Sequence, residues 1–445
     1  MRRIRIAETG IRFPLGPPKF ICFIAMKNLF QKEDWNRLLV SWYLFDFAQA
    51  LVATNITIYF SQWAVVDHGI TDFWFAAPFI LTTLILVFLT PYLGHMADRK
   101  DLHYKLYFFS TLLAILSILL MFFLGRFISN SLRAVILALA AYGLYQFFLQ
   151  LAFLPYNSFL KHISPPEHYG QISGFGFAFG QLGWIVGLLI TLPFTNHVIS
   201  TFGNDRLAPL IPSLIAFGLF IIPSYINLRK VKIKSDKNYS APTSFWKTTW
   251  NTLKESGKYS GVLPLLVSFY FFSDAIVTLS LFSAIYLQNV FQASDNFKVE
   301  IFILVEVGFM LGSFFGGSIS DRSGHKRTLS NSLMVTAVTI AAIALSPNLT
   351  LNLFLFPLFG LSIGVVYAAS RAYLASLIPQ SESGKFFGLY VFAERFSSIF
   401  GPAAWGIAVW ILHSYFPWNY RGAALAMAIL VAIGIIPQLI KSKEK

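Results

Sequence analysis

Long apolar runs separated by short polar connections dominate the chain. A membrane-crossing helix needs about 20 mostly apolar residues, and twelve segments of the 445-residue chain meet that requirement. They are residues 40–62, 73–94, 104–124, 133–156, 171–194, 207–228, 261–288, 299–319, 327–346, 350–377, 385–411 and 418–440. The pattern predicts an all-α membrane protein with twelve transmembrane helices. It excludes an outer-membrane barrel, whose strands would alternate in polarity over about 10 residues.

The longest polar interruption lies in the middle of the chain. Residues 229–260 are basic and predict a cytoplasmic linker that needs no fold of its own. This linker separates an N-terminal half of six helices, residues 38–228, from a C-terminal half of six, residues 261–440. Residues 1–37 are expected to form a disordered or surface-lying cytoplasmic tail, and residues 441–445 a short C-terminal one.

Lysine and arginine residues are divided unevenly between the two sides of the predicted membrane. With the N-terminus placed inside, 27 of the 34 fall on inside segments and only five on outside ones. Because such residues are enriched in cytoplasmic loops, both termini are predicted to be cytoplasmic. The net charge of +14 then reflects this topology and attraction to anionic lipid head groups, rather than binding to nucleic acid.

Composition narrows the class of protein further. Hydrophobic residues make up 56% of the chain and charged residues 12%, against about 45–50% and about 25% in soluble domains. These values exclude a soluble enzyme and a disordered protein. The single cysteine, Cys22, cannot form an internal disulfide. The eight histidines lack metal-ligand spacing and no phosphate-binding loop is present, so neither a metal, a cofactor nor ATP is expected.

The two predicted halves resemble each other in sequence. A segment with Gly94 and Asp98 follows the second predicted helix, and one with Gly317 and Asp321 follows the eighth. Further on, Pro165, Gly170, Gly174 and Gly187 recur at a fixed offset as Pro379, Gly384, Gly388 and Gly401. Repeats of this kind imply a pseudo-two-fold axis along the membrane normal and a substrate site between the halves.

The second copy of the segment resembles the cytoplasmic loop motif of the major facilitator superfamily. It reads Gly317-x-x-x-Asp321-Arg322-x-Gly324-x-Lys326-Arg327, whereas the first copy, Gly94-x-x-x-Asp98-Arg99, is followed by Asp101 and Leu102, where the motif prefers Gly and a basic residue. The resemblance implies a loop that latches the halves in one state. An Asp at a helix N-terminus is favoured by the helix dipole, and arginines can clamp it. Solvated positive-inside charge is the alternative interpretation of the first copy.

Three stretches carry a narrower resemblance. They are Ser41-Trp42-Tyr43-x-Phe45-Asp46-Phe47-Ala48, the segment from Tyr156-Asn157 to Gly176, and the segment from Ser370-Arg371 to Gly401-Pro402. Over roughly residues 35–440 the chain is similar to the branch that contains the yeast autophagy-related vacuolar amino-acid effluxer and its bacterial relatives. The resemblance implies a monomeric secondary transporter, in the plasma membrane if the source is bacterial, with an amino acid or similar zwitterion as substrate.

Six of the charged residues within the predicted helices are candidate functional groups: Asp46, Asp274, Glu306, Arg371, Glu394 and Arg395. A charge near the membrane centre costs at least about 2.5–3.5 kcal/mol, so each is expected to face a cavity and to have a partner. Asp46 and the deeper Asp274 are candidates for a proton or a substrate ammonium, and Asp274 is the stronger proton carrier. Arg371 can hold a substrate carboxylate or lock the end of its helix.

The remaining candidates have equally open interpretations. Glu394 and Arg395 point about 100° apart on a helix, so each should have its partner elsewhere, as should Glu306. Asn55 and Asn157 can line a polar cavity or form interhelical hydrogen bonds.

The sequence therefore predicts a secondary active transporter and not an enzyme, moving a small zwitterion by alternating access with proton coupling. Export of amphipathic cations is the main rival, because aromatic residues make up 17% of the chain. A non-transporting sensor on a carrier fold is a second alternative. A membrane-embedded phosphate transferase would need clustered carboxylates that hold Mg²⁺, and the sequence has no such acidic pair.

Overall fold

A computed structural model describes residues 36–70, 72–128, 131–195, 201–202, 206–231, 245–293, 295–397 and 400–439. Residues 1–35 of the predicted N-terminal tail, and the C-terminal tail, lie outside this description. The chain from Arg37 to Lys445 forms one unit, separate from Met1–Asn36, and is considered by itself.

All regular structure in the described residues is helical. In chain order it comprises α2 (Arg37–Asn55), η1 (Ile56–Phe60), η2 (Trp63–Asp67), α3 (Asp72–Lys100), α4 (His103–Phe127), α5 (Ser131–Ile163), η3 (Pro166–His168), α6 (Tyr169–Thr195), α7 (Leu210–Leu228), α8 (Phe245–Ser256), α9 (Val262–Phe291), α10 (Asp295–Ser323), α11 (His325–Leu345), α12 (Leu349–Leu377), η4 (Gln380–Glu382), α13 (Ser383–Phe396), α14 (Phe400–Ile411) and α15 (Trp418–Leu439). The prediction of an all-α membrane protein is confirmed.

Every predicted span coincides with one of these helices or with consecutive helical segments. Within the described residues, nine helices are long and apolar enough to cross a membrane, and ten if α3, bent by 47°, counts as one span. The first predicted span corresponds to α2 followed by two π-helical segments, and the eleventh to α13 and α14. The total of twelve spans stays a prediction.

Glycines on α6 explain why α2 and α6 pack closely. A Cβ atom on Gly183 would lie 2.2 Å from the carbonyl oxygen of Phe47, and one on Gly187 would lie 2.5 Å from that of Leu51. Only glycine therefore permits this approach between the two backbones, as small residues do at other membrane helix contacts. The close packing fixes the α2 face that carries Asp46.

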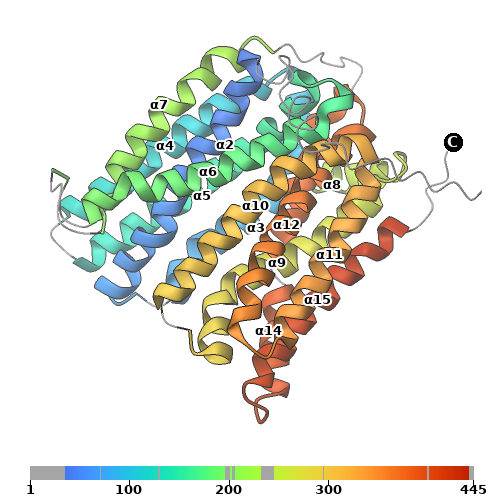
Figure 1. The fold of residues 1–445 in the computed structure, drawn as a ribbon. Helices are drawn as coiled ribbons and strands as arrows, with labels where there is room; N and C mark the ends of the chain where they lie inside the picture. Colours follow the sequence, from blue (N-terminus) through green and yellow to red (C-terminus); the bar gives the residue numbers. More distant parts are fainter. Residues whose placement is uncertain are drawn as a thin grey trace, which may run out of the picture. The chain divides into compact units, whose positions relative to one another are not determined.

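Helices from the two sides of the polar linker meet along three main contacts, α6 with α10, α3 with α13, and α6 with α12. Figure 1 shows the green α6 and the orange α10 running side by side. On each side of the linker further helices pack together, α2 against α6 and α7, and α12 against α10 and α11. The division into two six-helix halves stays a prediction, and these contacts are where such halves would meet.

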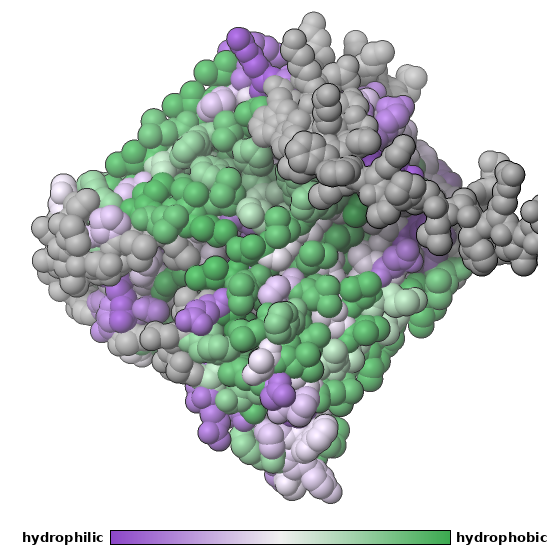
Figure 2. Space-filling view, viewed as in Figure 1, coloured by the Kyte–Doolittle hydropathy of each residue, from purple (hydrophilic) through white to green (hydrophobic). Residues whose placement is uncertain are grey.

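Large apolar side chains cover the outer faces of the helices. Leu219, Phe354 and Trp410 are 63%, 73% and 73% exposed. On the face drawn in Figure 2, hydrophobic residues gather over the helices and hydrophilic residues gather toward their ends. Because lipid rather than water solvates such a surface, the protein is a multi-pass integral membrane protein.

The polar linker contains a helix that its composition did not predict. Helix α8 packs against α3, α9 and α13, and buries Thr252 and Ser256 on its inner face. The expectation that the linker has no fold of its own is therefore wrong for this part. The reason is tertiary, since a short polar helix is stabilised here by its contacts with other helices rather than by its own propensity.

Candidate functional site

A cavity of about 460 Å³ lies between helices from both sides of the linker. Helices α2, α5 and α6 line it from one side, and α9, α10, α12 and α13 from the other. Its polar lining residues are Asp46, Gln49, Asn157, Gln181, Ser280, Glu306, Tyr367, Arg371, Tyr390 and Glu394. A cavity of this size can hold a small solute.

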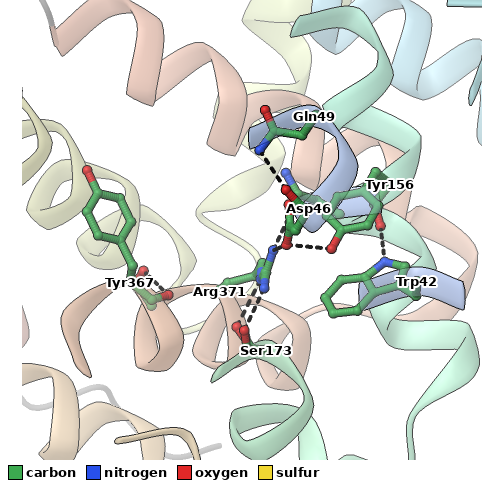
Figure 3. A network of polar contacts seen from close by, with 9 residues as sticks. Trp42, Asp46, Gln49, Tyr156, Ser173, Tyr367 and Arg371 are labelled. Carbon is green, nitrogen blue, oxygen red and sulfur yellow. Dashed lines mark hydrogen bonds and ion pairs between the residues drawn. The ribbon is translucent and has the colours of Figure 1, made fainter. Parts of the chain in front are cut away.

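An ion pair joins the two sides of this cavity. The Oδ2 atom of Asp46, on α2, lies 3.7 Å from the Nη1 atom of Arg371, on α12, and the same oxygen accepts a 2.6 Å hydrogen bond from the Tyr156 hydroxyl. Asp46 is 5% exposed and Arg371 only 2%. Figure 3 shows both side chains pointing toward each other. Two opposite charges removed from water in this way stabilise each other's ionised form.

The guanidinium of Arg371 is occupied by further groups of the first six helices. Its Nε donates to the Ser173 hydroxyl at 2.9 Å, its Nη2 to the Ser173 carbonyl at 2.7 Å, and its Nη1 to the Asn157 side-chain oxygen at 3.3 Å. These bonds leave no nitrogen of Arg371 without a partner, so in this conformation it is not a vacant clamp for a substrate carboxylate.

Aromatic rings enclose the same guanidinium. Its central carbon lies 4.0 Å from the ring centre of Phe177 and 4.8 Å from that of Trp42. Trp42 in turn stacks on Tyr156, with centroids 4.6 Å apart, and donates its indole N–H to the Tyr156 carbonyl at 2.9 Å. Cation–π attraction and exclusion of water both strengthen the ion pair.

The structure brings some of the sequence-predicted residues together and separates others. Glu306 and Glu394 line the cavity with Asp46, Asn157 and Arg371. The side chain of Arg395 lies outside the description.

Asp274 and Asn55 do not line the cavity. Asp274 is fully buried at the contact of α9 with α14, where a Cβ on Gly401 would lie 2.8 Å from its carboxylate. Its oxygens make no hydrogen bond of ordinary geometry within the described residues, although the Gly401 amide is a nearby donor. Asn55 donates to the carbonyls of Leu51 and Gly187, at 2.9 and 3.4 Å, and so supports the packing of α2 on α6.

Sequence reasoning did not assign Trp42, Tyr156, Ser173 and Phe177 to the site. Three of them, Trp42, Tyr156 and Ser173, stand in the stretches that carry the family resemblance, and this was the available signal. Their role was not evident because nothing in the sequence shows which face of α5 or α6 turns toward Arg371.

A second arrangement closes the end of the molecule that carries the two loop-motif segments, called the motif end below. The carboxylate of Asp98, at the end of α3, accepts hydrogen bonds from the Gly384 and Lys385 amides at 2.8 and 2.7 Å. The carboxylate of Asp321, at the end of α10, accepts them from the Gly170 and Gln171 amides at 2.6 and 2.7 Å. Each aspartate thus caps the N-terminus of a helix across the linker, where the helix dipole favours an anion.

The two motif copies have matching surroundings despite their unequal sequences. His103 Nε2 lies 3.1 Å from the Asp98 carboxylate, and His325 Nε2 lies 4.0 Å from that of Asp321. Glycines allow the backbones to touch, since a Cβ on Gly94 would lie 2.2 Å from the Gly384 carbonyl oxygen. A Cβ on Gly317 would meet the Gly170 carbonyl oxygen at 2.1 Å in the same way.

Other motif-end side chains add contacts or remain at the surface. Lys161 donates to the Ala375 carbonyl, and His162 Nε2 lies 2.9 Å from the Ser383 hydroxyl. Arg322 and Arg327 are exposed, whereas Arg99 and Lys326 are half-buried. Gly324 has a φ of +89°, which a residue with a side chain rarely adopts. Among the described residues no group of three His, Cys, Asp or Glu side chains is arranged to hold a metal ion.

A cavity between two sets of helices, closed at one end by paired loop motifs, defines a membrane carrier. The sequence profile of the Major Facilitator Superfamily matches residues 7–188, 176–402 and 265–443, and the chain belongs to this family. It is a transporter family, so the prediction that the protein is not an enzyme is confirmed.

Curated relatives of two kinds resemble the chain, the first over most of its length and the second over a smaller part. The uncharacterized MFS-type transporter YxiO of Bacillus subtilis is 22% identical, over 92% of this chain and 95% of its own. Autophagy-related protein 22-1 of Neosartorya fischeri and autophagy-related protein 22 of Yarrowia lipolytica are each 24% identical. The matches cover 62% and 59% of this chain and 48% of each relative, so the chain spans about half the length of these autophagy-related proteins.

Solved structures confirm the fold. A human organic anion transporter aligns with a TM-score of 0.70 at 12% identity, over 90% of this chain and 99% of its own. A bacterial homologue of the iron transporter ferroportin, in an outward-facing state, aligns with a TM-score of 0.70 at 14% identity, over 92% and 99%. The E. coli fucose:proton symporter aligns with a TM-score of 0.67 at 14% identity, over 92% and 98%.

Proposed function

We propose that the protein is a proton-coupled secondary transporter that moves an amino acid or a similar small zwitterion by alternating access. The observation that carries the proposal is the Asp46–Arg371 pair at the wall of the cavity, because it joins helices from both sides of the linker. A group that is buried, ionisable and shared between two moving parts can couple a proton to their movement. The likeness to autophagy-related proteins supports the choice of substrate class.

The motif end faces the cytoplasm in this proposal, because the inside segments carry most of the lysines and arginines. The structure then represents a conformation closed to the cytoplasm. Solved carriers in an outward-facing state align with it, which fits this assignment. The carrier acts as a monomer in a membrane that contains anionic lipids, with both termini in the cytoplasm.

The proposed mechanism begins at Asp46. A proton that reaches this carboxylate through the cavity removes its negative charge and with it the attraction to Arg371. The contact of α12 with α2 then weakens, and helices from the two sides of the linker can separate at the motif end. Asp46 takes this role instead of the expected Asp274, because Asp274 does not line the cavity and lies within one side of the linker.

Reconstituted vesicles with a pH-sensitive dye inside test the proposal. Addition of single amino acids should produce solute-dependent proton movement, and radiolabelled solute should exchange across the membrane. The Asp46→Asn variant should keep solute exchange but lose proton movement. Asp67→Asn is the matched control, because Asp67 pairs with Arg206 at an exposed position, 2.7 Å away. Absence of both exchange and proton movement with every amino acid would overturn the proposal.

Export of amphipathic cations is the second candidate function. Phe153, Phe177, Trp184, Phe269, Phe309 and Phe359 all line the cavity. Such a surface suits aromatic or lipophilic solutes. In the same vesicles, proton movement driven by lipophilic cations and by no amino acid would favour this candidate.

A further inference from the structure

Glu306 is a charged side chain of the cavity that has no part in the proposed mechanism. Glu306 lies in the middle of α10 and lines the cavity. It is partly buried, and it makes no hydrogen bond or ion pair with any residue that the structure describes. A carboxylate at such a position, with no partner among the described residues, can be satisfied by a cationic ligand.

The charges around the cavity favour the same conclusion. Among the described residues, three carboxylates line it, those of Asp46, Glu306 and Glu394, together with the guanidinium of Arg371. Arg371 is neutralised by Asp46 and is hydrogen-bonded to Ser173 and Asn157. The described lining therefore offers a ligand more negative than positive charge, and the guanidinium of Arg371 is already occupied.

Aromatic rings stand next to Glu306. Phe309 follows it by one turn of α10, so both side chains reach the cavity from the same helix face. Phe309 stacks on Tyr367 with centroids 5.7 Å apart, and Phe177 lies 5.6 Å from Tyr367 and 6.3 Å from Phe309. The rings of such a cluster attract a cation through their electron-rich faces.

From this arrangement we infer that Glu306 and the Phe177–Phe309–Tyr367 cluster form the binding site for a protonated amine of the transported solute. The amine binds the Glu306 carboxylate, and the apolar part of the solute contacts the three rings. A carboxylate on the solute is not required for binding in this conformation, because Arg371 is occupied. The inference rests on the proposed function, since it assumes that the cavity binds the transported solute.

Thermal unfolding of the purified full-length protein in detergent tests the inference with three matched probes. Phenylalanine carries both an ammonium and a carboxylate, phenethylamine only the ammonium, and hydrocinnamate only the carboxylate. Phenylalanine and phenethylamine should stabilise the wild-type protein in a concentration-dependent manner, whereas hydrocinnamate should not. The Glu306→Gln variant, which keeps the shape of the side chain, should bind both amines at least about tenfold more weakly.

Glu300→Gln is the control, because Glu300 is exposed near the start of the same helix. It should bind the amines as the wild type does. Stabilisation by hydrocinnamate but not by phenethylamine would overturn the inference, as would amine binding that Glu306→Gln leaves unchanged. Failure of all three probes to stabilise the wild type would also overturn it. The proposed carrier function is judged separately by solute exchange in vesicles, so either can fail alone.

Discussion

At the scale of single residues, the buried Asp46–Arg371 pair is the feature that most needs an explanation. A buried ion pair is rarely more stabilising than well-packed apolar side chains of the same volume. Its two members nevertheless sit across a contact between helices from both sides of the linker, with hydrogen bonds from Tyr156 to Asp46 and from Arg371 to Ser173. Stability alone does not account for this arrangement, whereas the proposed change of charge at Asp46 during transport would.

Replacing one member of the Asp46–Arg371 pair should lower the free energy of unfolding more than replacing both members. Arg371→Ala leaves the Asp46 carboxylate buried with only Tyr156 as a partner, which should cost about 3–5 kcal/mol of stability. Adding Asp46→Asn should restore part of this loss. A double-mutant cycle on the free energy of unfolding in detergent measures the coupling. The exposed pair Asp67–Arg206 is the control and should couple by about 0–1 kcal/mol. A buried pair with no greater coupling would contradict the prediction.

At the scale of helices, the repeated Pro and Gly positions of the sequence have a common structural purpose. Pro165 and Pro379 precede short 3₁₀ turns that lead into α6 and α13. The first backbone amides of α6 donate hydrogen bonds to the Asp321 carboxylate, and those of α13 donate to the Asp98 carboxylate. Figure 1 shows the long α10 that delivers Asp321 beside α6. The offset between the two copies therefore repeats a whole helix junction.

Asp98 should be as important as Asp321 for closing the motif end, although its motif copy departs from the family pattern. Asp98→Ala and Asp321→Ala each remove two charge-assisted hydrogen bonds, worth about 1.5–3 kcal/mol apiece. Each variant should shift the ratio of closed to open molecules by at least about tenfold. Spin labels are placed at Glu167→Cys and Ser323→Cys in a Cys22→Ala background. Double electron–electron resonance on each variant should then show, besides the label-to-label distance of the closed state, a second and longer distance from open molecules. An unchanged distance distribution in Asp98→Ala, with a changed one in Asp321→Ala, would refute the equivalence.

Helix α8 should be attached to the motif end in a pH-dependent way. The Lys385 ammonium lies 2.6 Å from the Glu255 carboxylate and 2.8 Å from that of Glu382. Burial raises the pKa of Glu255. The positive charges of Lys385 and Lys258, together with His95, lower this pKa by more than burial raises it, so it lies below its ordinary value of 4.5. A lowered pKa contributes stability that is fully present above 4.5 and is lost as the pH falls through the folded-state pKa.

A spin label at the exposed position Asn251→Cys, in the Cys22→Ala background, measures this attachment. The label should be equally ordered from pH 7 down to about 5, and more mobile below about 4.5. Glu255→Gln should be mobile at every pH, whereas Lys258→Gln is the control, because Lys258 is exposed and 3.9 Å from Glu255. A label in the wild type that loosens between pH 7 and 5 would contradict the assignment to Glu255.

At the scale of the whole molecule, much of the fold could be predicted, because each apolar run independently requires a membrane-spanning helix. The motif copies and the Pro and Gly repeats were also visible in the sequence, but the sequence did not predict that each motif aspartate meets a repeat from the other side of the linker. The site was predictable only in part. The cost of membrane charges pointed to Asp46 and Arg371, but their partners depend on how α2, α5, α6 and α12 are rotated. That rotation also placed Asp274 outside the cavity, and contacts across the molecule, rather than local sequence, stabilise α8.

Alternating access predicts that a covalent cross-link across the motif end stops transport but leaves solute binding in the cavity intact. His162, on α5, comes before the linker in the sequence and Ser383, on α13, comes after it. The His162 Nε2 atom and the Ser383 hydroxyl oxygen are hydrogen-bonded, 2.9 Å apart. In a Cys22→Ala background, His162→Cys/Ser383→Cys should be joined by a short bis-methanethiosulfonate, which forms a reducible disulfide with each thiol and releases sulfinate. Solute exchange in vesicles should then fall to the level of protein-free vesicles and recover on reduction, while solute binding by thermal shift persists.

The control joins two helices on the same side of the linker, through Thr336→Cys/Ser362→Cys on α11 and α12, where the hydroxyl oxygens are 2.9 Å apart. This link should leave exchange nearly unchanged, because these helices are expected to move as one body. Exchange that continues with the motif end fastened would exclude rocking of two halves about the cavity. Only the first link bridges parts that are expected to separate. Equal loss of exchange with both links would therefore show that any added rigidity stops the carrier, and would contradict the prediction.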